Sequence, residues 1–170
     1  PSHAYDRAYW LKGVYDALKL PAWVVAASLI SIGPLAQAAG YSAFDAMAST
    51  VLVWAGPAQV LFFSGVSAGM AMPALAFVIA LSSMRFLPMT MALIPILPLK
   101  NKSLFTQLLF GHMISVTVWA ESLRRLPNIS EENRIAYYFG FGGCCIFLST
   151  LSTGLGFLLT NTLPIAFGAG

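Results

Sequence analysis

The sequence predicts an all-α integral membrane protein, and three observations lead to this prediction. Of the 170 residues, 58% are hydrophobic and only 9% are charged, whereas a soluble domain carries about 25% charged residues. The charges are also clustered: residues 20–99 contain only Asp45 and Arg85, and residues 135–170 contain none. The uncharged runs reach about 20 residues, which is the length that a bilayer-spanning helix needs.

The same composition argues against several other classes of protein. The net charge of +3 comes without a basic stripe interleaved with aromatic residues, so we expect no nucleic-acid partner. Cys144 and Cys145 are adjacent in an apolar run and lack a C-x-x-C motif, so we expect them to pack as apolar side chains. The chain has no H-E-x-x-H motif, no paired carboxylates and no P-loop. We therefore expect no metal, no cofactor and no enzyme activity.

Residues 1–20 predict an amphipathic helix on the membrane surface. One face has the i, i+3, i+4, i+7 spacing of apolar residues in a helix, and its members are Leu11, Val14, Tyr15 and Leu18. The alternative is a disordered tail. We expect residues 21–170 to form the transmembrane domain, and we expect that domain to be incomplete at its C-terminal end, because residues 163–170 contain no polar stop.

About five hydrophobic segments follow the N-terminal helix. They cover residues 21–39, 44–67, 72–97, 104–122 and 135–159. Segment two is interrupted at its midpoint by Gly56 and Pro57, and a proline removes a backbone donor and clashes with the preceding turn. Segment four has Gly111 as its obvious breaker, and the glycines of segment five allow close helix packing.

The positive charges between the segments predict the topology. Lys and Arg lie before segment one, after segment three and after segment four. The positive-inside rule places such charges in the cytoplasm, and this holds everywhere only if segments two and four are re-entrant. If every segment crosses once, the rule is broken. We therefore expect a multi-pass protein of the bacterial inner membrane, with a cytoplasmic N-terminus and an inverted repeat of the kind found in secondary transporters.

Arg85 is the first candidate for a functional residue. It lies in the middle of segment three, where a cation costs about 2.5–3.5 kcal/mol and normally faces a cavity or a partner. Its guanidinium could bind a carboxylate through two hydrogen bonds. The alternative is a snorkelling arginine, or one bonded to backbone carbonyls that Pro88 sets free.

The stretch Trp54-Ala-Gly-Pro-Ala-Gln59 is the second candidate. Gly56 and Pro57 break the helix, and the N–H groups at the start of the next half-helix, near Ala58, suit an anion. Gln59 adds an amide donor and acceptor at the same place. The alternative is a simple proline kink with the amide bonded to a neighbouring helix.

His112 and Ser115 form the third candidate. A membrane histidine can relay protons because its pKa lies near neutrality, and the alternative is an ordinary interhelical hydrogen bond. Glu121 lies three and four residues before two arginines, so we expect a helix-end ion pair there. Asp45, near the start of segment two, is placed to cap a helix.

These segments and motifs resemble the AzlC family, the large subunit of bacterial branched-chain amino acid exporters, from about residue 13 to residue 170. Residues 54–59 resemble the family motif of an aromatic residue followed by A-G-(A/S)-(A/S)-Q, and Met84-Arg85-Phe86 resembles its N/D-x-R motif. Ser83 stands where the family has an acid or an amide, and residues 111–115 lack the family's T-D-E stretch. These departures predict a difference in coupling or in substrate.

The resemblance implies a membrane transporter subunit that exports branched-chain or other small amino acids together with a small AzlD-type membrane subunit. We expect Arg85 and the helix end at residues 56–59 to hold the substrate carboxylate, and Ser83, His112 and Ser115 to line the path. Two alternatives remain. One is a membrane scaffold that binds a partner without transporting, and the other is a channel-like pore for another small solute.

Overall fold

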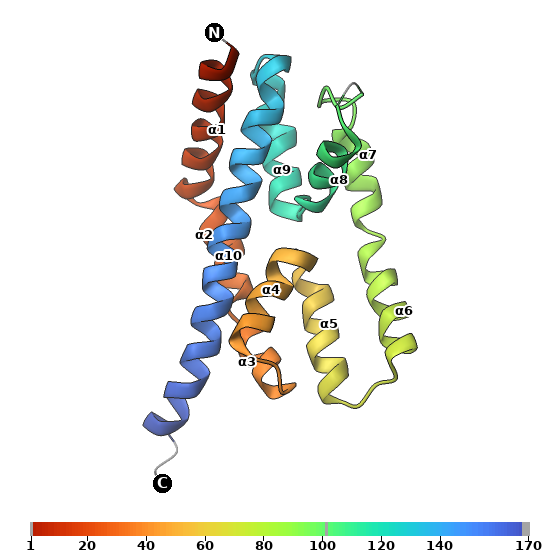
Figure 1. Ribbon diagram of the computed structural model, residues 1–170, viewed down its shortest axis with the longest axis vertical. Coiled ribbons are helices and arrows are strands. Elements are labelled where there is room, and N and C mark those ends of the chain that lie inside the picture. The colour runs from red at the N-terminus through yellow and green to blue at the C-terminus, as the bar shows by residue number, and fades with distance from the viewer. Residues whose placement is uncertain (1, 101, 168–170) are drawn as a thin grey trace. The chain divides into compact units, whose positions relative to one another are not determined.

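The computed structural model describes residues 2–100 and 102–167, and within these residues every regular element is helical (Figure 1). The predicted all-α class is therefore confirmed. The chain forms two compact units: unit 1 comprises residues 1–23 and 85–146, and unit 2 comprises residues 24–84 and 147–170. The long helix α10 (Glu131–Phe167) contributes its first part to unit 1 and its second part to unit 2.

The other helices are divided between the two units in the same way. Unit 1 also contains α1 (Ser2–Lys19), α7 (Phe86–Leu93), α8 (Leu104–His112), α9 (Val116–Arg125) and the 3-10 turn η1 (Leu126–Asn128). Unit 2 also contains most of α2 (Pro21–Leu29), together with α3 (Ile32–Ala38), α4 (Ala43–Val53), α5 (Gly56–Ser67) and α6 (Met72–Ser83).

Three stretches of the described chain are long and apolar enough to cross a membrane: Pro21–Ala38, Met72–Leu93 and Glu131–Thr160. They correspond to the predicted segments one, three and five. Segments two and four are each a pair of short helices, α4 with α5 and α8 with α9. Helices of 11 and 12 residues are shorter than the roughly 30 Å hydrocarbon core. Both segments are broken as predicted, but Gly111 lies inside α8 and the second break follows His112. The side from which each pair enters the membrane stays a prediction.

Prolines explain three of the breaks. α2, α4 and α6 end at Leu29, Val53 and Ser83, and each end lies four or five residues before a proline, namely Pro34, Pro57 and Pro88. A proline has no N–H to donate to the carbonyl four residues earlier, and its ring clashes with that carbonyl. Segment four contains no proline, and there the second helix begins at a capping serine.

Glycines bring helices into close contact at one place in each unit. In unit 1, a Cβ on Gly13 would collide with the carbonyl oxygen of Tyr137, and one on Gly140 would collide with that of Trp10. The contact is reciprocal. Gly13 faces the carbonyl of Tyr137, three residues before Gly140, and Gly140 faces the carbonyl of Trp10, three residues before Gly13. Small residues allow such close approach of membrane helices.

Unit 2 repeats this reciprocal contact. A Cβ on Gly33 would meet the carbonyl oxygen of Thr153, and one on Gly156 would meet that of Ile30. The spacing of three residues is the same on both helices. Each unit therefore combines one broken helix pair with one reciprocal glycine contact on α10, while the inverted sense of the predicted repeat stays a prediction.

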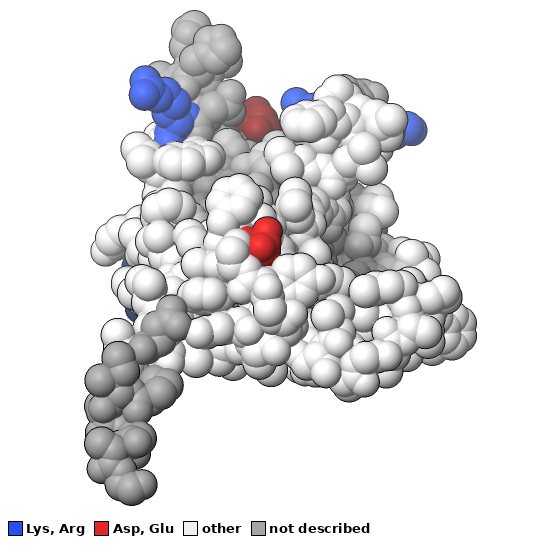
Figure 2. All heavy atoms as spheres, turned by 60° about the horizontal axis from the view of Figure 1, so that its bottom comes forward, with Lys and Arg blue, Asp and Glu red and all other residues white. Residues whose placement is uncertain are grey.

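The predicted N-terminal helix is present as α1. It buries Gly13, Asp16 and Ala17, and its predicted apolar face is largely exposed, with Leu11, Tyr15 and Leu18 at 41–65%. This exposed face agrees with lipid contact, although the location on the membrane surface stays a prediction. Uncharged side chains cover most of the face of the molecule in Figure 2, as expected for a surface that meets hydrocarbon.

Candidate functional site

The break between α4 and α5 has well-defined backbone geometry. Trp54 is buried and adopts φ 44°, ψ 37°, the left-handed conformation, which costs a residue with a side chain about 1–2 kcal/mol. Ala55 is extended and caps α5, which carries its proline in the first turn. The chain reverses there, so that α4 and α5 lie side by side (Figure 1). The N–H groups of Gly56 and Ala58, in the first turn of α5, have no partner within the helix.

A cavity of about 330 Å³ lies beside this break, within unit 2. We call it the α4–α5 pocket. Most of its wall is apolar, and its polar lining comes from two residues of α4 and one of α5. Its lining residues are Asp45, Ala48, Ser49, Leu52, Val53, Ala58, Gln59, Phe62, Phe63 and Ile79. A concave apolar site with a few convergent polar groups is the usual form of a small-molecule site.

Gln59 is the most constrained polar side chain of the pocket, at 1% exposure. Its Nε2 donates to Ser49 Oγ at 2.9 Å and to Thr50 Oγ1 at 3.0 Å. Thr50 Oγ1 also lies 2.9 Å from Thr153 Oγ1 on α10. The amide oxygen Oε1 is buried and has no hydrogen-bond partner in the described part of the chain. The sequence predicted Gln59 as a site residue, but the unpaired oxygen follows only from the tertiary contacts.

Asp45 supplies a negative charge to the same pocket. Its carboxylate forms a capping box with Ser42, accepting from Ser42 N at 3.0 Å and from Ser42 Oγ at 2.7 Å. The hydrogen bond from the Ser42 hydroxyl lowers the pKa of the exposed Asp45 carboxyl below its ordinary value. The predicted capping role is confirmed.

The predicted residues near Arg85 fall in different units. Ser83 ends α6 in unit 2 and donates to the carbonyl of Ile79 at 2.9 Å, one turn away on the same helix. Arg85 belongs to unit 1 and is exposed, with its guanidinium carbon 5.0 Å from the centroid of the Phe86 ring. In the described part of the chain it makes no ion pair. Gln59 and Arg85 are thus two separate candidates.

His112 and Ser115 flank the break between α8 and α9 in unit 1. Ser115 caps α9, because its Oγ accepts from Val118 N at 3.3 Å. His112 ends α8 and is partly buried. Trp119 lies four residues after the cap, as Gln59 does in α5, and its buried Nε1 has no partner in the described chain. The pair α8–α9 therefore has an unpaired donor, Trp119 Nε1, at the position where the pair α4–α5 has an unpaired acceptor, Gln59 Oε1.

Unit 1 contains an ionic cluster around the buried Asp16 that was not predicted from the sequence. The Asp16 carboxylate accepts from Tyr137 Oη at 2.9 Å and pairs with Lys19 at 2.8 Å and with Arg125 at 3.1 Å. Burial raises the Asp16 pKa, but the hydrogen bonds from Lys19 and Tyr137 and the charge of Arg125 outweigh it, so the pKa lies below its ordinary value. Glu121 pairs with Arg125 and Arg124, as predicted. In the sequence, the only indication of a buried face at Asp16 is that Gly13 and Ala17 are small.

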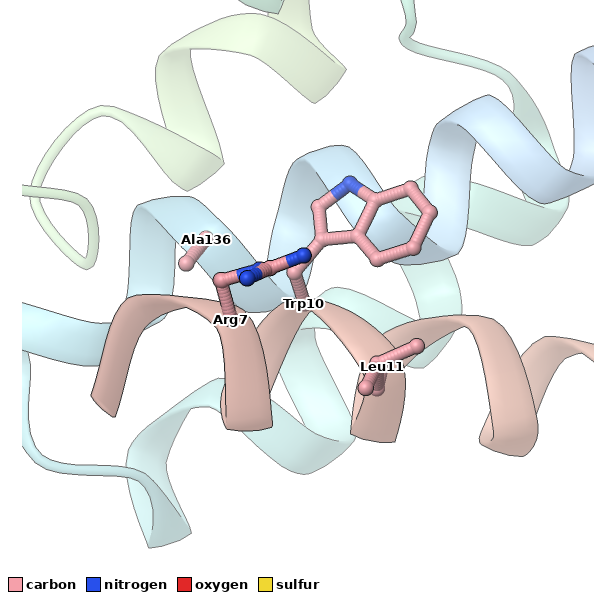
Figure 3. A pocket seen from close by; sticks show the side chains of 4 residues that line it. All are labelled: Arg7, Trp10, Leu11 and Ala136. Carbon is pink, nitrogen blue, oxygen red and sulfur yellow. The ribbon is translucent and has the colours of Figure 1, made fainter. Parts of the chain in front are cut away.

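Two further cavities lie in unit 1. One, of about 370 Å³, is formed by Arg7, Trp10 and Leu11 from α1 and Ala136 from α10 (Figure 3). The other, of about 560 Å³, lies beside α7 and α8 and includes Lys100, Gln107 and Glu131. Gln107 donates there to the backbone carbonyls of Lys102 and Leu99, so its amide is already used by the loop.

Neither cysteine forms a disulfide, and Cys145 is buried, in agreement with the predicted apolar role. Among the described residues, no group of three His, Cys, Asp or Glu side chains could hold a metal ion.

The fold and the pocket define a multi-span helical membrane protein in which a broken helix lines a small, mostly apolar cavity. The family model described as AzlC protein matches residues 22–163, so the chain belongs to the AzlC family. This membership makes it a membrane protein related to branched-chain amino acid transport. No curated protein and no solved structure matches the chain.

Proposed function

We propose that this protein is a transporter subunit that exports branched-chain or other small amino acids across the bacterial inner membrane. The observation that supports the proposal most is the α4–α5 pocket beside the helix break. Its apolar wall suits an aliphatic side chain, and the start of α5 offers N–H groups to a carboxylate. Broken helices in transporters bind polar substrate groups in this way.

Arg85, which belongs to unit 1, is a second and separate candidate for binding the substrate carboxylate. It is the only cation between residues 20 and 99, and an exposed guanidinium in an apolar segment needs an anionic partner. A substrate carboxylate would meet that need through paired hydrogen bonds. We expect a small AzlD-type membrane subunit to complete the transporter.

The test is amino acid efflux from cells loaded with dipeptides that contain leucine, valine or methionine. The protein is expressed together with any small membrane subunit encoded beside its gene. We expect faster excretion than from cells without the protein, and we expect Arg85→Ala to abolish the gain while the protein remains in the membrane. Arg124→Ala, which removes an exposed arginine in a helix-end ion pair, is the matched control and should excrete normally.

Two results would contradict the proposal. If no amino acid is excreted faster although both subunits are inserted, amino acid export is wrong. If Arg85→Ala prevents the subunits from assembling, Arg85 binds a partner chain, as the scaffold alternative predicts.

A further inference from the structure

We propose that Gln59 Oε1 binds the ammonium group of the amino acid, so that the α4–α5 pocket selects solutes with a free amino group. This inference rests on the proposed function and deepens it. The sequence suggested only that the amide helps to hold a carboxylate. The hydrogen bonds around Gln59 assign its free oxygen to the opposite end of the zwitterion.

The two hydroxyl protons beside the amide have acceptors of their own. Ser49 Oγ donates its proton to the carbonyl of Ala46 at 2.7 Å. Thr50 Oγ1 has two acceptors within reach, Thr153 Oγ1 at 2.9 Å and the Ala46 carbonyl at 3.3 Å. Each hydroxyl carries a single proton, so both protons have an acceptor other than Gln59.

These hydroxyls therefore face Gln59 with lone pairs, which fixes the orientation of the amide. Its Nε2 uses both hydrogens, on Ser49 and Thr50. The flipped amide would place Oε1 against two oxygens and leave two buried N–H groups without an acceptor. An unpaired buried donor or acceptor costs about 1–3 kcal/mol, so the observed orientation is favoured and leaves Oε1 as a single free acceptor.

The rest of the pocket favours a cationic donor at that oxygen. Among the described residues that line the pocket, Asp45 is the only charged one, and none is Lys or Arg. A carboxylate would meet repulsion from both Asp45 and Gln59 Oε1, whereas an ammonium group has three donors and a positive charge. The N–H groups at the start of α5 are close to Gln59 in sequence and can donate hydrogen bonds to the carboxylate of the same molecule.

The size and the wall of the pocket agree with one amino acid. The cavity of about 330 Å³ is at the lower end of the range for small-molecule sites, roughly 300–1,000 Å³. Leu52, Phe62 and Ile79 offer apolar surface to a branched side chain. A free amino group at Gln59 and an aliphatic side chain against this wall together describe the substrate class.

The test measures binding of three compounds that share one side chain. The protein, with its membrane partner subunit, is placed in lipid nanodiscs and titrated with L-leucine, L-leucinamide or 4-methylpentanoate. Leucinamide lacks the carboxylate and 4-methylpentanoate lacks the ammonium group. We expect leucine to bind about tenfold or more tightly than 4-methylpentanoate, and we expect leucinamide to compete with leucine.

Gln59→Met keeps the length of the side chain and removes the acceptor, so we expect the preference for leucine over 4-methylpentanoate to disappear. Gln107→Met is the matched control, because Gln107 donates to loop carbonyls outside the α4–α5 pocket. Gln59→Glu keeps an acceptor at the position of Oε1, while its second oxygen requires the Ser49 and Thr50 hydroxyls to turn their protons toward it. In the folded variant the preference should be retained or increased. If Gln59→Met fails to fold, the preference measured for Gln59→Glu tests the ammonium site instead.

The outcomes separate the two proposals. Equal binding of leucine and 4-methylpentanoate by the wild type, or an unchanged preference in Gln59→Met, overturns the ammonium site but leaves amino acid transport intact. A lost preference in Gln59→Glu also overturns it. If the folded wild-type complex binds none of the three compounds, the proposed function itself fails.

Discussion

Single glycines set the distance between α10 and the helices packed on it. Gly156 is the clearest case, because a Cβ there would collide with the carbonyl oxygen of Ile30. That carbonyl is free of the usual helical hydrogen bond because Pro34 has no N–H to donate. One proline and one glycine, distant in sequence, therefore create a single close contact.

We expect Gly156→Ala to destabilise the protein, since an added methyl group in a tightly packed place costs about 1–3 kcal/mol. Gly143→Ala, also on α10, is the matched control because no atom lies within 4 Å of its added Cβ. Alanine favours a helix over glycine by about 1 kcal/mol, so Gly143→Ala should keep or raise the stability. Thermal unfolding in detergent measures both variants. Equal melting temperatures of Gly156→Ala and the wild type would contradict the close contact between Gly156 and Ile30.

At the scale of the elements, the two broken helix pairs share a plan but differ in how their breaks are made. The first break depends on Pro57 and on the left-handed backbone of Trp54. The second has no proline and depends on the cap at Ser115. A serine cap satisfies a backbone donor that would otherwise be lost at the start of a helix.

This geometry predicts a structural role for Ser115, which the sequence suggested as a residue lining the transport path. We expect Ser115→Ala to lower the stability by about 1 kcal/mol, and Ser115→Asp to restore it because aspartate also caps helices. Thermal unfolding and leucine efflux are measured for both variants. Normal stability with lost efflux in Ser115→Ala would instead support the path-lining role.

At the scale of the whole molecule, the charge pattern and the short helices together predict three membrane crossings. The three long apolar stretches alternate along the chain with the two broken pairs. The lysines and arginines of the loops then fall on one side of the membrane. The arrangement predicts that each broken pair begins and ends on the same side.

Single cysteines test this topology in a background with Cys144 and Cys145 replaced by alanine. Ala38 and Ser67 flank the first broken pair, and both are exposed. We expect a membrane-impermeant maleimide to label cysteines at both positions from the periplasmic side. Labelling of the two from opposite sides would mean that the pair crosses the membrane.

Ser103 and Asn128 flank the second pair and are also exposed. Cysteines at these positions should both be labelled from the cytoplasmic side. If Ser67 and Ser103 were labelled from the same side, the two pairs could not enter from opposite sides, and the inverted repeat would be wrong.

The sequence alone determined the helical membrane class, the number of hydrophobic segments and the presence of breaks in segments two and four. These features are local: a run of apolar residues needs no partner to cross a bilayer, and Pro57 has no N–H to donate to the carbonyl of Val53. The family motif at residues 54–59 also marked the helix break and Gln59 in advance. The caps at Asp45 and the ion pair at Glu121 were predictable because both partners lie within one turn.

Only the tertiary structure decided which groups meet across the chain. Asp16 and Tyr137 are separated by 121 residues and Thr50 and Thr153 by 103, and no local pattern relates them. The free oxygen of Gln59 depends on where the protons of Ser49 and Thr50 go, and that depends on how α10 packs against α4. Several faces of each helix are apolar, and long-range packing decides which of them is buried against another helix. A pattern of hydrophobic residues does not specify that choice.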